Sequence, residues 1–145
     1  MMASRRKSRI SAFQALYFWD VTKAPLEELV SFAWLEEKKI NLYKENGTYD
    51  FAVLLVAGTL ENINEIDKTI KEHLQHWEID RLNRVDLAVL RLSVYSLMYQ
   101  HEIPPSIVID EAIGICREYG TDDSYKFVNG VLDSIRKSLT AKEPV

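Results

Sequence analysis

The stretch from Leu82 to Tyr99 is apolar on nearly all sides and predicts a central, buried helix. Apolar residues recur at helical spacing on one face and fill much of the other: Val85, Ala88, Val89, Leu92, Leu90, Val94, Leu97 and Met98. A helix with this pattern must be buried among other helices. Its short length and its charges, Arg84, Asp86 and Arg91, exclude a membrane span. We expect Asn83 to cap its N-terminus, with Asp86 three residues on in a capping-box-like position.

Amphipathic patterns before this stretch predict three further helices. The first begins near Ser4 or Ser8, ends near Asp20 and has its apolar stripe at Ile10, Phe13, Leu16 and Tyr17. Pro25 suits the first position of a second helix that extends to about Trp34. A long stripe predicts a third helix over residues 50–74, in which Gly58 permits close approach of a neighbour. The polar residues 36–48 are predicted as a connection that includes an Asn46-Gly47 turn.

Two helices are predicted after the central one. Pro105 begins the first of them, and Gly120 ends it. Its single cysteine, Cys116, occupies an apolar position and is expected to be an inert core thiol. The last helix is capped by Asp122, Asp123 or Ser124 and runs to about residue 139, with Gly130 marking a close helix crossing.

These elements predict an all-α protein of six to seven helices, arranged as two small bundles packed together. A length of 145 residues fits one domain built from two subdomains. We expect an N-terminal subdomain at 1–76 that carries a basic arm, and a C-terminal subdomain at 77–145.

Charge is distributed unevenly along the chain. Acidic residues outnumber basic ones, 22 to 18, yet Arg5, Arg6, Lys7 and Arg9 all precede the first acid, Asp20. A basic segment on an acidic body is typical of an arm that binds nucleic acid, although short basic ends are also often only solvated. Because Arg5 and Arg9 lie one helical turn apart, we expect them to present two charges on one face.

Composition and motifs favour a cytoplasmic protein without catalytic chemistry. With a single cysteine no internal disulfide can form, and neither a signal peptide nor a membrane span is recognisable. The sequence contains no phosphate-binding glycine loop and no nucleophile motif. His73 and His76 are three residues apart but have no third ligand at a recognisable spacing, so we predict no metal. We therefore expect a protein that is not an enzyme and needs no cofactor.

A set of motifs follows the chain in a fixed order: Arg5-Arg-Lys-Ser-Arg9, Ala12-Phe-Gln-Ala-Leu-Tyr17, Ala88-Val-Leu-Arg-Leu92, Ile103-Pro104, Val108-Ile-Asp-Glu-Ala112 and the run from Tyr119 to Asp133. This ordered set resembles the NusB family of bacterial transcription antitermination factors. The stretch from about Leu26 to Leu74 contributes little to this resemblance, and we assign no functional residue there.

The resemblance implies an all-helical fold of two small bundles and a role in transcription. NusB proteins pair with NusE, a small-subunit ribosomal protein that doubles as a transcription factor. The pair binds boxA RNA and joins an RNA polymerase complex that suppresses termination, notably on ribosomal RNA operons. Some members of the family self-associate, so a homodimer is a further possibility for this chain.

The resemblance also implies RNA-binding residues at two places. The basic N-terminus contributes Arg5, Arg6, Lys7 and Arg9, and the Gln-Ala-Leu-Tyr match adds Tyr17. The Asp-Ser-X-Lys-Phe segment adds Asp123, Ser124, Lys126 and Phe127. Single-stranded RNA is held by cations at its phosphates and by aromatic rings under its bases, which these residue types provide. Tyr17 and Phe127 fit core packing equally well, and Asp123 fits a helix cap.

Two other functions remain open at this point. The chain is also compatible with a non-catalytic RNA-recognition module related to the N-terminal domains of ribosomal-RNA cytosine methyltransferases. A homodimeric helical interaction protein is the other alternative.

Overall fold

The computed structural model describes residues 4–75 and 78–142 of the chain. Helices account for most of this part, and it contains no strand. The elements are α1 (Arg5–Thr22), α2 (Leu26–Leu29), α3 (Glu37–Asn46), α4 (Thr48–Glu61), α5 (Ile63–Glu72), the 3-10 helix η1 (Ile79–Arg81), α6 (Arg84–Tyr99), α7 (Pro105–Tyr119) and α8 (Ser124–Lys142). The all-α class is confirmed. Eight α-helices in the described residues exceed the predicted six to seven.

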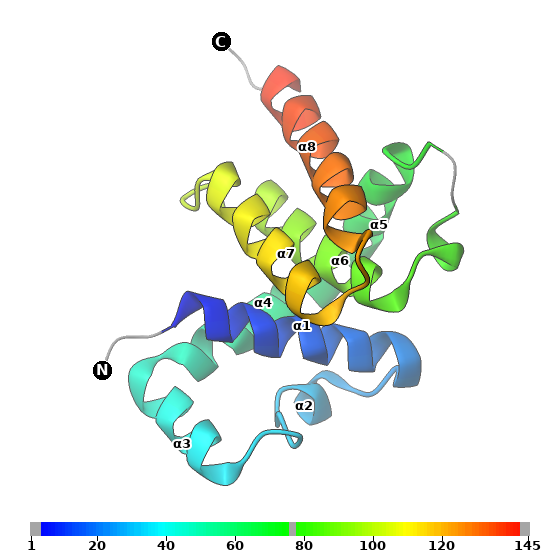
Figure 1. Cartoon of the computed structure of the whole chain (residues 1–145). Helices are drawn as coiled ribbons and strands as arrows, with labels where there is room; N and C mark the ends of the chain where they lie inside the picture. Colours follow the sequence, from blue (N-terminus) through cyan, green and yellow to red (C-terminus); the bar gives the residue numbers. More distant parts are fainter. Residues whose placement is uncertain (1–3, 76–77, 143–145) are drawn as a thin grey trace.

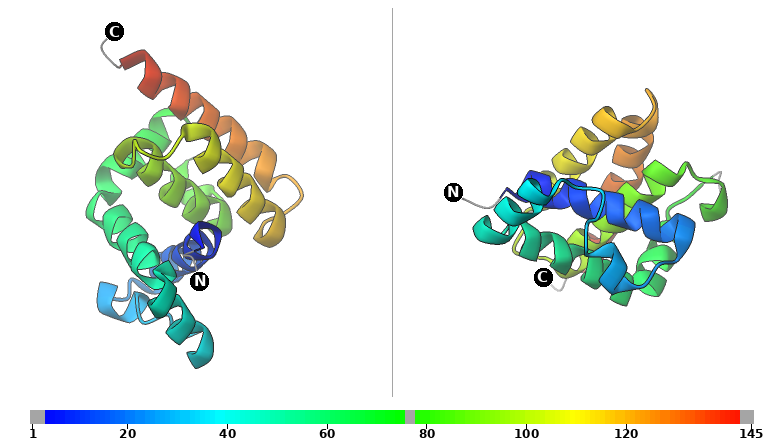
Figure 2. Two further views of the ribbon diagram at one scale, coloured as in Figure 1. Left: turned by 90° about the vertical axis from the view of Figure 1, so that its left-hand side faces the viewer. Right: turned by 90° about the horizontal axis from the view of Figure 1, so that it is seen from below.

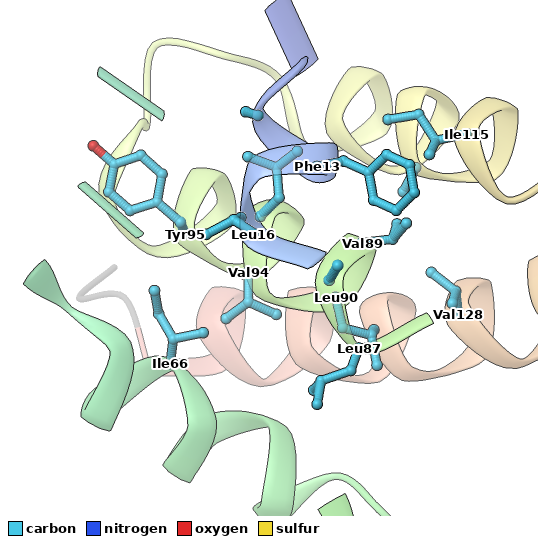
Figure 3. Packing of buried hydrophobic residues seen from close by; sticks show 14 of the residues in the cluster. Phe13, Leu16, Ile66, Leu87, Val89, Leu90, Val94, Tyr95, Ile115 and Val128 are labelled. Atoms are coloured by element: carbon cyan, nitrogen blue, oxygen red, sulfur yellow. The ribbon is translucent and has the colours of Figure 1, made fainter. Parts of the chain in front are cut away.

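Helix α6 is the centre of the fold, as its apolar pattern predicts. It packs against α1, α4, α5, α7 and α8. Figure 3 shows its residues Val89, Leu90 and Val94 among side chains contributed by the surrounding helices. Asn83 caps its N-terminus, because its Oδ1 accepts the backbone N–H of Val85 at 2.8 Å. Every residue from Asp86 to Leu97 is buried, so this helix is interior over three turns.

Helix α1 crosses the middle of the molecule, with α3 on one side and α7 and α8 on the other (Figure 1). It packs mainly against α4 and α6. Helices α7 and α8 lie side by side, as the left view of Figure 2 shows. The predicted boundary between two bundles at residue 77 lies outside the described residues. Within the described ranges, none of the helices combines the length and the apolar character needed to cross a bilayer.

The predicted helix over residues 50–74 is two helices, because α4 ends at Glu61 and α5 begins at Ile63. The Asn62 side chain donates to the Gly58 carbonyl at 2.8 Å and so competes with the backbone of the helix. Gly58 does allow the close approach predicted for it, since a methyl group there would overlap the Tyr95 ring of α6.

Three local predictions in the chain are wrong. The polar segment 36–48 contains α3, which buries Tyr43 and ends at Gly47 with a φ of 85°. The second helix is only the four residues of α2, because the chain turns at Phe32 with a φ of 48°. Gly130 marks no helix crossing, since a Cβ placed there would meet nothing within 4 Å.

Candidate nucleic-acid interface

The N-terminal turn of α1 carries the four predicted cations in three different environments. Ser4 caps the helix by accepting the Lys7 N–H at 3.1 Å. Arg5 and Lys7 are exposed, and the Arg5 guanidinium carbon lies 3.8 Å from the centre of the Phe51 ring. This stacking on α4 orients a long side chain while leaving its charge at the surface.

Arg6 is held on α7 rather than free in solvent. Its Nη1 lies 3.5 Å from Glu111 Oε2, and its Nη2 lies 3.9 Å from Glu118 Oε2. Gly114 leaves the space for this guanidinium, since a Cβ on that residue would overlap it. The two acids and the glycine recur at helical spacing on one face, which is the sequence signal that could have identified this contact.

Arg9 is buried, with only 3% of its surface exposed. Its Nη1 donates to Ser96 Oγ at 3.0 Å, and burial lowers its pKa to about 10 against a smaller opposing effect from Glu111. The expectation that Arg5 and Arg9 present their charges on one exposed face is therefore wrong for Arg9. Arg9 lies on the stripe of Phe13 and Leu16, four and seven residues away, and that spacing predicts burial.

Tyr17 lies farther along α1 and is 41% exposed, so its ring is available at the surface. One turn earlier, Phe13 packs against Tyr119 with 5.3 Å between ring centres. The end of α7 therefore reaches the middle of α1, and the turn that leads from α7 into α8 begins there.

The first turn of α8 contains the second predicted group of residues. Asp123 and Lys126 are exposed, and Phe127 is half-buried. Asp123 directly precedes the helix, and its carbonyl accepts the Phe127 N–H at 3.2 Å. Ser124 is buried, and its hydroxyl accepts the Thr121 N–H at 3.0 Å. Burial raises the pKa of the neighbouring Asp86 carboxyl, against a smaller lowering effect from the Ser124 hydroxyl.

A cavity of about 370 Å³ opens beside Lys126 and Phe127. Its other wall comes from the end of α5, where His73 Nδ1 lies 2.8 Å from Ser134 Oγ of α8. Leu74 and Val131 add apolar surface, and Gly130 leaves the space open. A partly apolar hollow with polar groups at its edge is the kind of surface that accepts an unstacked base. This cavity was not anticipated from the sequence.

The structure does not join the two groups of predicted residues directly. Among the described residues, no hydrogen bond or ion pair links Arg5, Arg6, Lys7 or Arg9 to the segment from Asp123 to Phe127. Helix α7 connects them indirectly, because it holds Arg6 at one point and leads into α8 at its end. Of the predicted site residues, Arg5, Lys7, Tyr17, Asp123 and Lys126 are exposed, whereas Arg9 and Ser124 are buried.

Metal and thiol chemistry receive no support from the arrangement of side chains. The described ranges hold no group of three or more His, Cys, Asp or Glu residues placed to bind a metal ion. His76, one of the two histidines considered above, lies outside the described residues. Cys116 is fully buried, and burial raises the pKa of its thiol to about 12, which favours an unreactive group.

Comparison with known proteins identifies relatives over nearly the whole chain. The profile of the NusB family matches residues 6–137. The transcription antitermination protein NusB of Treponema denticola is 58% identical over 136 residues, which cover 94% of this chain and 98% of that protein.

Solved structures of similar proteins have the same fold. A structure of NusB from T. maritima is 35% identical and superimposes with a TM-score of 0.80 over 94% of this chain and 93% of its own. A crystal structure of antitermination factors NusB and NusE in complex with dsRNA is 34% identical, with a TM-score of 0.78 and coverage of 95% and 99%.

Proposed function

Since this chain belongs to the NusB family, we propose that it is a transcription antitermination factor that binds RNA and pairs with NusE. The name of the Treponema denticola relative supports the role in antitermination. The complex of NusB and NusE with dsRNA supports both partners, because that NusB has the fold of this chain.

The observation that carries the proposal is the pair of exposed, unpaired cations at the start of α1. Neither Arg5 nor Lys7 forms an ion pair among the described residues, although the whole chain has a net charge of −4. Surface cations that are not needed to balance nearby acids are free to neutralise phosphates, and RNA binding then becomes salt-dependent. Arg6 would join them by exchanging its weak contacts with Glu111 and Glu118 for phosphate oxygens.

Base contacts are proposed for the aromatic and polar groups at the start of α8. Phe127 lines a cavity large enough for an unstacked base, and Lys126 lies at its edge. Tyr17 is a second exposed ring and is assigned either to a base or to NusE. Asp123 would accept a hydrogen bond from a base, since a carboxylate repels phosphate. Arg9 and Ser124 would act by supporting the surface, because both side chains are buried.

The finer part of the proposal concerns the RNA and the assembly. We assign boxA single-stranded RNA as the ligand, and the RNA polymerase antitermination complex on ribosomal RNA operons as the site of action. In this role the protein acts in the cytoplasm, catalyses no reaction and requires no cofactor.

The test is a fluorescence-anisotropy titration of boxA RNA with the protein, alone and with NusE, at two salt concentrations. Tighter and salt-sensitive binding in the presence of NusE is expected. Reversing both cations, Arg5→Glu with Lys7→Glu, should weaken binding by about tenfold per cation, as for a lost charged hydrogen bond. The slope of the logarithm of the binding constant against the logarithm of the salt concentration should also become shallower by about 1.4. This figure follows from about 0.7 for each lost phosphate contact with a single strand.

The matched control reverses two exposed lysines on α3, Lys38→Glu with Lys39→Glu, which makes the same change in net charge. This control should bind RNA almost as tightly as the unmodified protein. Equal losses in both variants would show that only net charge matters, and would contradict a site at the start of α1. An absence of RNA binding with and without NusE would overturn the proposal and leave a helical interaction protein.

A further inference from the structure

A second, smaller pocket lies on the side of α1 that faces α4 and α7. Its volume is about 170 Å³. Four helices or connections contribute to it: Arg5 and Arg9 from α1, Phe51 from α4, Glu102 and Ile103 from the connection after α6, and Ile107, Val108 and Glu111 from α7. The proposed RNA role uses Arg5 at the edge of this pocket but not the pocket itself, so its occupant is a separate question.

The charged group that lines this pocket is a buried guanidinium with unused donors. Arg9 is 97% removed from solvent, and its Nε and Nη2 have no hydrogen-bond partner among the described residues. The third nitrogen, Nη1, is occupied by Ser96, whose hydroxyl in turn donates to Gln100 Oε1 at 2.7 Å. A buried cation with two free donors is costly unless an anion accepts from them.

Among the acids of the described residues, none supplies that anion. Glu111 is the acid of the lining that influences the Arg9 charge, but its Oε2 lies 3.5 Å from Arg6 Nη1. Glu102 is exposed at the connection after α6. The described residues therefore leave these two nitrogens of Arg9 without an acceptor, which a bound partner could supply.

The walls and the volume of the pocket restrict what that acceptor can be attached to. Phe51, Ile103, Ile107 and Val108 make the walls apolar, and Ile107 is 50% exposed at the surface. Sites for free small molecules occupy roughly 300–1,000 Å³, so this pocket is small for one. It has the size of a site for one inserted side chain, in the way that interface pockets take an anchor residue.

The charges around the pocket select a single carboxylate over a polyanion. Glu102 and Glu111 both line it, so a phosphodiester chain would bring several charges near two acids. One carboxylate at the end of a short apolar stem meets Arg9 and Arg5 with less repulsion. We propose that the pocket between α1, α4 and α7 receives an acidic side chain, of the glutamate type, from a protein partner, with Arg9 as its buried ligand.

The test follows the Arg9 side chain directly by NMR on the full-length protein. The Nε–Hε signal of Arg9 is recorded while acetyl-Ala-Glu-Ala-amide is added, and acetyl-Ala-Gln-Ala-amide serves as the isosteric neutral probe. A saturable shift with the glutamate peptide, and none with the glutamine peptide, is expected. Equal responses to both peptides, or no response to either, would overturn the proposal.

Dimethyl phosphate is the third probe, because it carries the anion of the RNA backbone. It should shift the Arg9 signal less than the glutamate peptide does at the same concentration. A larger shift with dimethyl phosphate would overturn the assignment to a protein side chain and make the pocket a phosphate site.

A variant pair at Ile107 tests the same contact without an added ligand. Because Ile107 is half exposed, Ile107→Glu places a carboxylate at the pocket with little risk to the fold, and Ile107→Gln is its neutral match. The glutamate variant should shift the Arg9 signal and abolish the response to the glutamate peptide, whereas the glutamine variant should keep that response. Identical Arg9 signals in the two variants would contradict the proposal.

Discussion

The two ends of α1 carry charge in opposite ways. At the C-terminal end, Asp20 is almost buried and lies within 3.7 Å of Lys23, 3.2 Å of Arg84 and 3.2 Å of Arg91. Arg91 also donates its Nε and Nη2 to the two oxygens of Asp67, at 2.9 and 3.0 Å. At the N-terminal end, Arg5 and Lys7 are exposed, and the buried Arg9 has no carboxylate within ion-pairing distance among the described residues.

This difference separates charges that hold the fold from charges that are available to a ligand. The Asp20–Arg91–Asp67 network joins α1, α6 and α5, and each of its groups has a partner of opposite sign. A ligand could bind the charges of this network only by breaking ion pairs that hold the three helices together. The start of α1 has the reverse property, because its cations outnumber the acids that contact them. Charge that the fold does not use is therefore the better guide to a binding surface than the count of basic residues.

The largest expected effect comes from Arg91→Met, which removes the central cation of the ion-pair network at the C-terminal end of α1. Removing the central cation leaves Asp20 and Asp67 without their main partner, which should lower the free energy of unfolding by about 3 kcal/mol. Urea unfolding followed by circular dichroism measures this change. Arg84→Met is the control, since Arg84 contacts the same Asp20 but its side chain is 47% exposed, and it should cost less than about 1 kcal/mol. Equal losses would mean that burial does not decide the strength of these pairs.

Arg9→Met, the equivalent substitution at the N-terminal end of α1, is expected to change the free energy of unfolding by less and in the opposite direction. The pKa of Arg9 is lowered to about 10 in the folded protein, so its charged form is less stable there than in the unfolded chain. That cost is present at every pH below about 10 and diminishes only as the pH rises from there toward the higher, ordinary pKa of an arginine. Arg9→Met removes the buried charge and should raise the free energy of unfolding by about 1 kcal/mol near neutral pH.

The same urea experiment checks Arg9→Met against Arg91→Met. A loss as large as that of Arg91→Met would contradict the contrast between the two ends of α1. It would show that the Ser96 contact of Arg9 is worth as much as a bidentate ion pair.

Much of the fold could be predicted because the local pattern and the global packing agree in α1, α6, α7 and α8. The apolar pattern of residues 82–99 could only suit a buried helix, and Asn83 caps it as expected. Prediction failed where one side chain decided the outcome. Asn62 divides α4 from α5 with a hydrogen bond to its own helix, and the charges of α3 conceal the spacing of Ile40 and Tyr43.

The candidate site could be predicted by residue type but not by exposure. Motifs identified Arg5, Lys7 and Lys126, and all three are at the surface. They identified Arg9 equally, although packing against α6 buries it. The cavity beside Phe127 joins residues that directly follow α5 to residues of α8 more than fifty positions away, so no local spacing could indicate it.

An effect about as large as that of Arg9→Met is expected from Ser4→Ala, which removes the N-cap that orders the exposed N-terminal turn of α1. Ser4 Oγ accepts the Lys7 N–H, and loss of an N-cap of this kind costs about 1 kcal/mol. Because the cap also holds the turn that carries Arg5 and Lys7, RNA affinity should fall as well, but less than in the double charge reversal. Urea unfolding and the anisotropy titration measure the two quantities on one variant.

Ser106→Ala is the matched control for this change. Ser106 is exposed in the first turn of α7, and its side chain forms no hydrogen bond within the described part of the chain. It should alter neither stability nor RNA affinity appreciably. If Ser4→Ala lowers stability but leaves RNA affinity at the level of Ser106→Ala, the cations act without a preformed helical turn. The two ends of α1 would then differ in a second respect besides charge balance. The C-terminal end needs the helix to position Asp20 for its ion pairs, whereas Arg5 and Lys7 at the N-terminal end would act without an ordered helical turn.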